Sequence, residues 1–203
     1  MATNLKRAYF NDLASRWDEQ PAAPDAPAKA RKFLERVRCP GALRILDVGC
    51  GTGFLLPHLL DMFPSSTCIV ELDLAERMLT ESGRKFPDEQ VLRVCGDARS
   101  LPFADECFDL VLGFGVLPHL GDAASAVPQL FRGVKPAGVI AVAHLMGSAE
   151  LNAFHTTLGE PVARDVLLPA DELGQIFRAL NAVQITGEER PDWYFVRAEK
   201  AAL

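Results

Sequence analysis

The chain has 203 residues, and its hydrophobic content of 49% is enough for a sizeable core in one domain. Its formal net charge is -6 at pH 7, so no broad basic surface is available to bind a phosphate backbone, and we expect no nucleic-acid partner. No run of about 18 apolar residues exists for membrane insertion, and the five cysteines form no C-x-x-C pair. These features predict a cytoplasmic protein with reduced thiols and no metal site.

The first apolar residues, from Leu5 to Trp17, recur at near-helical spacing and predict an amphipathic helix. Three prolines follow within residues 21–27 and cannot continue that helix. We therefore predict a single domain over 1–203, in which a helix and Pro-rich connector over 1–27 precede a core over 28–203.

The stretch 44–56, RILDVGCGTGFLL, has the pattern of a strand, a tight glycine turn and a helix. Glycines let a backbone turn sharply and approach a ligand closely, and the free amides at the start of the next helix favour a negatively charged ligand group. A dinucleotide fingerprint, G-x-G-x-x-G, would need its third glycine at the position of Phe54, but Gly53 comes one place early. A small ligand is expected at this turn, and a pyrophosphate is disfavoured.

Strands and helices then alternate, which predicts a parallel sheet with helices on both faces. The predicted strands are 43–48, 67–72, 90–95, 108–114 and 139–144, and the predicted helices are 28–38, 75–85, 123–134 and 171–180. Two final strands, 182–188 and 193–199, are joined by the short turn 189–192 and should pair in antiparallel fashion. The predicted fold is α/β, a Rossmann-like doubly wound sheet of seven mostly parallel strands that ends in an antiparallel hairpin.

The G-x-G-x-G form preceded by an acidic residue resembles motif I of the class I S-adenosylmethionine-dependent methyltransferases, the broad group that includes the ubiquinone and menaquinone C-methylases. Residues 96–103, GDARSLPF, resemble that family's G-D-A-x-x-L-P-F segment. The start of the chain, from Phe10 to Asp18, resembles a family segment that tends to cover the ligand pocket. The resemblance implies S-adenosylmethionine as cofactor, S-adenosylhomocysteine as product, and methyl transfer to a small-molecule acceptor whose reacting oxygen, nitrogen or carbon atom stays open.

The resemblance also implies roles for three carboxylates. In the family, the residue matching Asp47 orders the glycine loop and the cofactor's amino group, the one matching Asp73 accepts the ribose hydroxyls, and the one matching Asp97 accepts the adenine amine. Asp73 also follows a predicted strand, where ligands of open α/β sheets bind, although a carboxylate at a helix N-terminus would look the same. The predicted cofactor-binding residues are Asp47, Gly49, Cys50, Gly51, Gly53, Asp73, Leu74, Met78, Asp97, Ala98, Phe114, Gly115 and His119.

The acceptor side is predicted from chemistry. Methyl transfer from a sulfonium is an in-line displacement that depends on alignment and exclusion of water, and a general base is needed only if the acceptor must lose a proton. Imidazoles titrate near neutrality, so His155 and His144 are the predicted catalytic residues, ahead of His119. His155 lies in 145–170, a long irregular stretch that we expect to contact the substrate.

Three alternatives stay open. A nicotinamide oxidoreductase would share the sheet but not the glycine spacing. An arsenite methyltransferase would need converging thiolates, and Cys39, Cys95 and Cys107 are scattered along the chain. A cofactor-binding regulator or partner without catalysis would lack an acceptor pocket, which the sequence does not reveal. We expect a monomer or a homodimer, since an exposed end strand could pair with a second copy.

Overall fold

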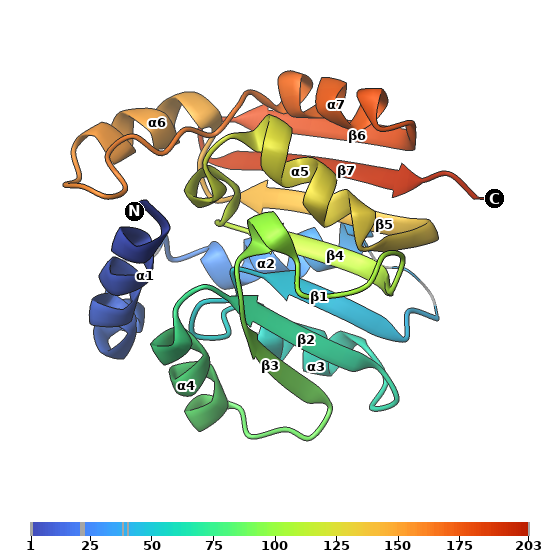
Figure 1. The fold of residues 1–203 in the computed structure, drawn as a ribbon, viewed down its shortest axis with the longest axis horizontal. Coiled ribbons are helices and arrows are strands. Elements are labelled where there is room, and N and C mark those ends of the chain that lie inside the picture. Colours follow the sequence, from blue (N-terminus) through green and yellow to red (C-terminus); the bar gives the residue numbers. More distant parts are fainter. Residues whose placement is uncertain (1, 21–22, 38, 40, 203) are drawn as a thin grey trace.

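The structure is a computed structural model that describes residues 2–20, 23–37, 39 and 41–202. Seven strands form one sheet in the order β3-β2-β1-β4-β5-β7-β6, with helices on both faces (Figure 1). The strands are β1 (Arg44–Val48), β2 (Cys68–Asp73), β3 (Val91–Cys95), β4 (Phe108–Phe114), β5 (Val134–His144), β6 (Ala182–Arg190) and β7 (Trp193–Lys200). The α-helices are α1 (Ala2–Leu13), α2 (Ala26–Val37), α3 (Leu56–Met62), α4 (Glu76–Lys85), α5 (Ala123–Arg132), α6 (Ser148–Thr156) and α7 (Ala170–Ala179). The 3-10 helices are η1 (Ala14–Glu19), η2 (Ala98–Ser100) and η3 (Leu117–Leu120).

The sheet is parallel except at one edge. β1 pairs in parallel with β2 and β4, β2 with β3, and β4 with β5, whereas β7 is antiparallel to both β5 and β6. The chain leaves β3 at one edge and re-enters on the far side of β1, so the order reverses between β1 and β4. In open α/β sheets, ligands bind outside the carboxyl ends of the strands at such a reversal. The predicted doubly wound sheet with its closing hairpin is confirmed.

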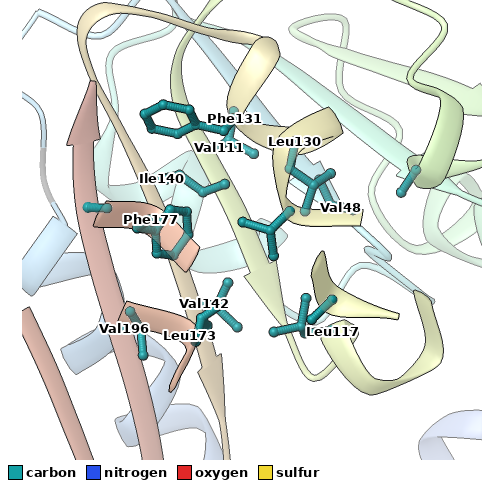
Figure 2. Close-up of a cluster of buried hydrophobic side chains, with 14 of the residues drawn as sticks. Val48, Val111, Leu117, Leu130, Phe131, Ile140, Val142, Leu173, Phe177 and Val196 are labelled. Carbon is teal, nitrogen blue, oxygen red and sulfur yellow. The ribbon is translucent and has the colours of Figure 1, made fainter. Parts of the chain in front are cut away.

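The core has two layers because successive strand residues project to opposite faces. Leu46 and Val48 of β1 pack with residues of α5 and α7 on one face, which Figure 2 shows in close-up. Ile45, which precedes Leu46 in β1 and projects to the other face, packs there with residues of α2 and α3. Full burial of a side chain the size of Phe177 contributes roughly 1.5–3 kcal/mol, so the two layers hold the strand ends in place.

The N-terminal helix differs from the prediction in its second half. The α-helix ends at Leu13, and the 3-10 turns of η1 carry the chain on to Glu19. Ala14 is buried against Ala75 and Met78, so tertiary packing tightens the backbone here and overrides the simple helical period. In the predicted connector, Pro21 and Ala22 lie outside the described residues, as do Arg38 and Pro40 farther on.

Two other boundaries were predicted wrongly. The fifth strand begins at Val134 rather than 139, because α5 ends at Arg132 and Val134 already pairs with Phe108 of β4. The stretch 145–170, predicted to be irregular, contains α6. That helix lacks a clean apolar stripe, so the periodicity on which the prediction depended is absent from its sequence.

Candidate functional site

The glycine turn after β1 adopts a backbone that favours glycine. Gly49, Gly51 and Gly53 have φ of +64°, +55° and +87°, the left-handed region that a Cβ disfavours. A Cβ on Gly49 would lie 2.1 Å from Cγ2 of Val116, and one on Gly53 would lie 2.8 Å from Oγ of Ser82. The tight turn predicted from the spacing is therefore present. At Gly49 and at Gly53, both the positive φ and a close neighbouring side chain disfavour a larger residue.

Asp73 links the end of β2 to this turn. Its Oδ2 accepts a hydrogen bond from the Gly51 amide at 3.0 Å, and its Oδ1 accepts one from the Ala75 amide at 2.8 Å, just before α4 begins. Burial raises the pKa of Asp73, and these amides oppose the rise. The carboxylate thus braces the glycine turn and the start of α4 together, and it still borders the pocket described next.

A pocket opens at the carboxyl edge of the parallel strands, on the side where Figure 1 places α1 and α6. It contains about 990 Å³ of empty space, including solvent at its mouth. From the predicted cofactor set, its lining includes Gly49, Gly51, Asp73, Leu74, Met78, Asp97, Ala98, Gly115 and His119. The predicted residues outside this lining are Asp47, Cys50, Gly53 and Phe114, of which Asp47 and Cys50 are buried.

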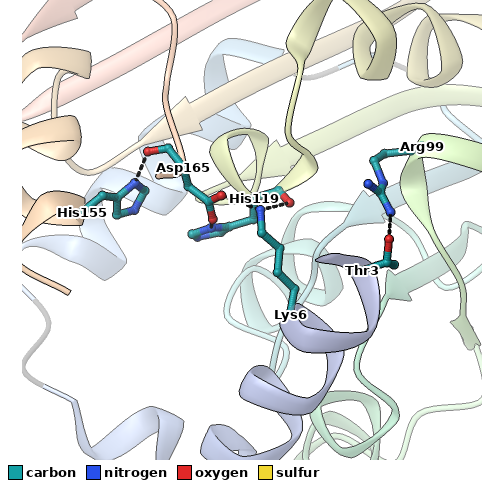
Figure 3. Close-up of polar contacts among 6 residues, drawn as sticks. All are labelled: Thr3, Lys6, Arg99, His119, His155 and Asp165. Carbon is teal, nitrogen blue, oxygen red and sulfur yellow. Dashed lines mark hydrogen bonds and ion pairs between the residues drawn. The ribbon is translucent and has the colours of Figure 1, made fainter. Parts of the chain in front are cut away.

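Asp97, at the start of η2, is held by its neighbour Arg99. Its Oδ1 accepts the Arg99 amide at 3.0 Å, and its Oδ2 accepts Nη2 of Arg99 at 2.7 Å. The side-chain bond from Arg99 lowers the pKa of Asp97. Arg99 also contacts the hydroxyl of Thr3, which fastens α1 to this side of the pocket (Figure 3). The sequence did not identify Thr3 or Arg99, since nothing local marks a contact across this separation.

A cluster of polar side chains is centred on Asp165 (Figure 3), and its members Lys6 and His119 line the pocket. Nδ1 of His119 lies 2.6 Å from Oδ2 of Asp165, and Nζ of Lys6 donates to Oδ1 of Asp165 at 2.5 Å and to the His119 carbonyl at 2.9 Å. Nδ1 of His155 lies 2.7 Å from the Asp165 carbonyl, and the two imidazole rings are 5.3 Å apart. One aspartate therefore ties together α1, η3 and α6.

The cluster favours a neutral His119 with its proton on Nδ1. Burial lowers the pKa of His119, while the bond to Asp165 opposes this. Burial would raise the pKa of Asp165, but His119 and Lys6 outweigh it and keep the carboxyl ionised. An ionised carboxylate only accepts, so we assign the shared proton to Nδ1 of His119, which leaves Nε2 as an acceptor.

The three histidines differ in their access to the pocket. His119 lines it, whereas His155 and His144 are not in the lining. His144 ends β5 and accepts the Met146 amide at 3.2 Å, and burial lowers its pKa to about 3. The sequence ranked His155 and His144 above His119 because it could not place Asp165, which lies in an irregular stretch 46 residues beyond His119.

The N-terminal segment forms a wall of the pocket through Phe10 and Trp17. Their rings meet edge to face at 5.9 Å, and the Phe10 ring meets that of His119 at 5.3 Å. Asp18, at the end of the segment, accepts the hydroxyl of Thr52 from the glycine turn at 2.6 Å. A direct hydrogen bond thus joins the N-terminal segment to the glycine turn.

Other kinds of site are not evident in the part of the chain that the structure describes. Within those residues no three His, Cys, Asp or Glu side chains gather as metal ligands would. None of the described helices combines the length and the apolar character that crossing a bilayer requires. The five cysteines are all free thiols.

The donor set fits an adenosyl cofactor with a cationic sulfur. The turn allows close approach of a ligand, and Asp97 and the amide of Ala98 offer an acceptor and a donor at adjacent positions. The carboxyl groups of Asp47 and Asp73 lie beside the turn, where they suit a cationic group. Asp47 is buried with Oδ2 lacking a hydrogen-bond partner among the described residues. Such an arrangement attracts a cation and would repel a polyphosphate.

The comparisons agree with this chemistry. Residues 46–142 match the methyltransferase domain family. A biotin biosynthesis bifunctional protein BioHC from Teredinibacter turnerae is 36% identical over 109 residues, covering 50% of this chain and 19% of that protein. A demethylmenaquinone methyltransferase from Renibacterium salmoninarum is 28% identical over 196 residues, covering 95% of this chain and 74% of that protein. The chain spans half or less of the length of the first relatives that it matches.

Solved structures match over most of the chain. A chain of the complex between the Haloferax volcanii Trm112 methyltransferase activator and the putative methyltransferase superposes with a TM-score of 0.81 at 16% identity, covering 97% of this chain and 98% of that one. Haemonchus contortus phosphoethanolamine N-methyltransferase 2, in complex with phosphomonomethylethanolamine and S-adenosylhomocysteine, superposes with a TM-score of 0.71 at 17% identity, covering 86% and 52%. At these identities the likeness establishes the fold.

Motif, fold and relatives converge on the family predicted from the glycine turn. S-adenosylmethionine is the cofactor of that family, and methyltransferase is its enzyme class, so both predictions are confirmed at the level of the family. In motif, fold and relatives, the chain resembles the class I S-adenosylmethionine-dependent methyltransferases, and residues 46–142 match their methyltransferase domain.

Proposed function

We propose that this chain transfers the methyl group of S-adenosylmethionine to a small-molecule acceptor. The observation that carries the proposal is that the glycine turn, Asp73 and His119 line one pocket, and that Asp165 holds the His119 ring from outside the lining. When bound, the cofactor supplies an electrophilic methyl on a sulfonium, whose departure needs no proton donor. The protein's task is then alignment, exclusion of water and, for some acceptors, removal of a proton.

In this proposal one end of the pocket holds the adenosyl group. Asp73 takes the ribose hydroxyls, for which its position at the end of β2 is suited, and Asp97 with the Ala98 amide takes the adenine edge. Met78 flanks the base, and Gly115 faces the methionine portion. Three predicted residues outside the lining act indirectly. Gly53 and Cys50 shape the glycine turn, and the Phe114 ring packs on that of Phe54, with 5.4 Å between the ring centroids.

At the other end of the pocket, His119 is proposed as the proton acceptor. The carboxylate of Asp165 fixes the ring and stabilises the imidazolium that would form, while Nε2 is left to receive a proton from the methyl acceptor. Phe10 and Trp17 exclude water from this end. His155, predicted as catalytic from the sequence, adjoins His119 and in this proposal supports it through its bond to the Asp165 carbonyl. His144, the other histidine predicted as catalytic, is outside the pocket lining and takes no part in this proposal.

A small acceptor suits the net charge of -6 and the enclosing α1 better than a nucleic acid does. Relatives named for demethylmenaquinone, trans-aconitate and malonyl-[acyl-carrier protein] mark out the acceptor classes to try first. We propose a cytoplasmic monomer or homodimer. One structural neighbour is a methyltransferase in complex with an activator protein. Light scattering should therefore measure the oligomeric state of the purified chain alone, alongside the assay.

The test is transfer of labelled methyl from S-adenosylmethionine to a panel of quinols, carboxylic acids and amines. Wild-type protein should label at least one acceptor class, and His119→Ala should retain cofactor binding while losing transfer to acceptors that must lose a proton. Asp122→Asn, a conservative change at the exposed cap of α5, is the matched control. Binding of the cofactor without transfer to any class would favour the regulatory or partner protein left open above.

A further inference from the structure

A row of charged side chains lies buried beneath the glycine turn. Asp47 of β1 and Glu71 of β2 are register partners in the parallel pair, and Arg93 of β3 is the register partner of Glu71. Partners on neighbouring strands project to the same face, so the three side chains lie side by side. Glu71 has no exposed surface, and Asp47 is 2% exposed. Such burial is unusual for carboxyl groups and calls for compensation.

The hydrogen bonds of this row are incomplete. Oε2 of Glu71 accepts the hydroxyl of Ser82 at 2.6 Å and lies 2.9 Å from Nε of Arg93. Oε1 of Glu71 and Oδ2 of Asp47 are buried, and within the described ranges neither has a partner. The free Oε1 lies directly under the turn, since a Cβ on Gly53 would be 3.3 Å from it. Of the two carboxyl groups, Glu71 is the one paired with the guanidinium of Arg93.

Among the residues that the structure describes, the groups around the row do not restore the balance of charge. Asp73 adds a carboxylate, although backbone amides satisfy it. Lys85 of α4 is paired with Asp18 at 2.7 Å. On the other side of Asp47 lies Leu112, its apolar register partner on β4. The buried thiol of Cys50 is also close enough for Asp47 to influence its pKa. A second ionised carboxylate would thus be an uncompensated buried charge, which proteins avoid by protonation.

The pKa shifts of the two carboxyl groups agree that one of them is protonated. Burial raises the pKa of Asp47 well above its usual range, and the neighbouring Glu71 and Asp73 raise it further. Burial also raises the pKa of Glu71, but Ser82 and Arg93 oppose the change. Asp47 is therefore the member of the pair that carries the proton.

We propose that the pair of Asp47 and Glu71 holds one proton in the ligand-free protein and releases it to solvent when a cationic group of the cofactor binds at the turn. The inference rests on the proposed function, because the cofactor supplies the cation. One positive charge leaves as another arrives, so the net charge of the buried region is conserved. Cofactor affinity consequently rises with pH, by up to about tenfold per pH unit while one proton is released.

Calorimetry of S-adenosylmethionine binding in phosphate and in Tris, whose ionisation heats differ, measures the released protons directly. Measured at a series of pH values above the unfolded pKa of an aspartate, about 3.9, wild-type binding should be accompanied by the release of up to one proton. Asp47→Asn should bind without release and with an affinity independent of pH, and Asp122→Asn should behave as wild type. Binding without proton release by the wild type, or release that persists in Asp47→Asn, overturns the proposal. With S-adenosylhomocysteine, equal release assigns the cation to the ammonium group, and smaller release assigns it to the sulfonium.

A second measurement needs no ligand. Because the pKa of Asp47 is higher in the folded than in the unfolded protein, the folded state binds the extra proton, and stability declines as pH rises between those values. The urea midpoint of wild type should therefore fall relative to that of Asp47→Asn as pH rises above the unfolded pKa of about 3.9. A constant difference between the two overturns the proposal. If the midpoints diverge as expected but S-adenosylmethionine does not bind, the proposed function fails instead.

Discussion

Gly49 is the residue whose replacement the structure tolerates least. Its φ of +64° and the 2.1 Å approach of an added Cβ to Val116 leave no relaxed geometry for alanine. We expect Gly49→Ala to destabilise the fold by roughly 1–3 kcal/mol and to abolish cofactor binding, because the turn must shift. Urea unfolding and calorimetry with S-adenosylhomocysteine measure the two effects. Gly159→Ala, at a glycine with open space around it, should match wild type in both, and equal behaviour of the two variants would refute this reading.

Asp165 gives a pH-dependent contribution to stability. Its pKa in the folded protein lies below the unfolded value of about 3.9, since the bonds from His119 and Lys6 outweigh burial. The stabilisation is therefore complete above about pH 4 and is lost as pH falls through the lower, folded value. Urea midpoints between pH 6 and 3 should fall more steeply for wild type than for Asp165→Asn. Parallel curves would mean that Asp165 does not stabilise the fold through its charge.

At the scale of elements, Glu189 of β6 starts two helices. Its Oε1 accepts the amide and hydroxyl of Ser148 at 2.8 and 2.5 Å, and its Oε2 accepts the Ala170 amide at 2.7 Å. Neither α6 nor α7 has a capping side chain at its own N-cap, so this carboxylate replaces both.

We expect Glu189→Ala to cost about 1–3 kcal/mol of unfolding free energy, because buried amides lose their acceptor. The neighbouring Glu188 forms partly exposed ion pairs with Arg36 and Arg190, so Glu188→Ala should cost no more than about 1 kcal/mol. Urea unfolding of the two variants provides the comparison. Equal costs would show that the shared cap is energetically unimportant.

Helix α1 is attached to the rest of the domain mainly by polar contacts near the pocket. Lys6 contributes two of these, to Asp165 and to the His119 carbonyl. Lys6→Ala should speed amide exchange in α1 at least several-fold without changing exchange in the sheet, since the sheet does not depend on this contact. Lys32→Ala, at an exposed position on α2, is the matched control. Unchanged exchange in α1 would mean that its apolar packing alone holds it.

At the scale of the molecule, the sequence was sufficient for most of the fold. Glycine spacing, alternating elements and the terminal hairpin are local patterns, and they predicted the sheet, the turn and the position of Asp73. The sequence did not predict features that depend on contacts between residues far apart in the chain. Asp165 acquires its role from His119 and Lys6, 46 and 159 residues away. Similarly, α6 owes its start to Glu189 rather than to a periodic sequence of its own.

The central claim is that this pocket binds an adenosyl cofactor, and thermal unfolding with ligands tests it most directly. At a hundred times its dissociation constant, a ligand stabilises by about 2.7 kcal/mol, and each kcal/mol raises the Tm of a domain this size by roughly 2–4 °C. S-adenosylmethionine and S-adenosylhomocysteine should each raise the Tm by several degrees, NAD should leave it unchanged, and Asp73→Ala should remove the shift. A shift with NAD alone, or none with the adenosyl ligands, would contradict the account.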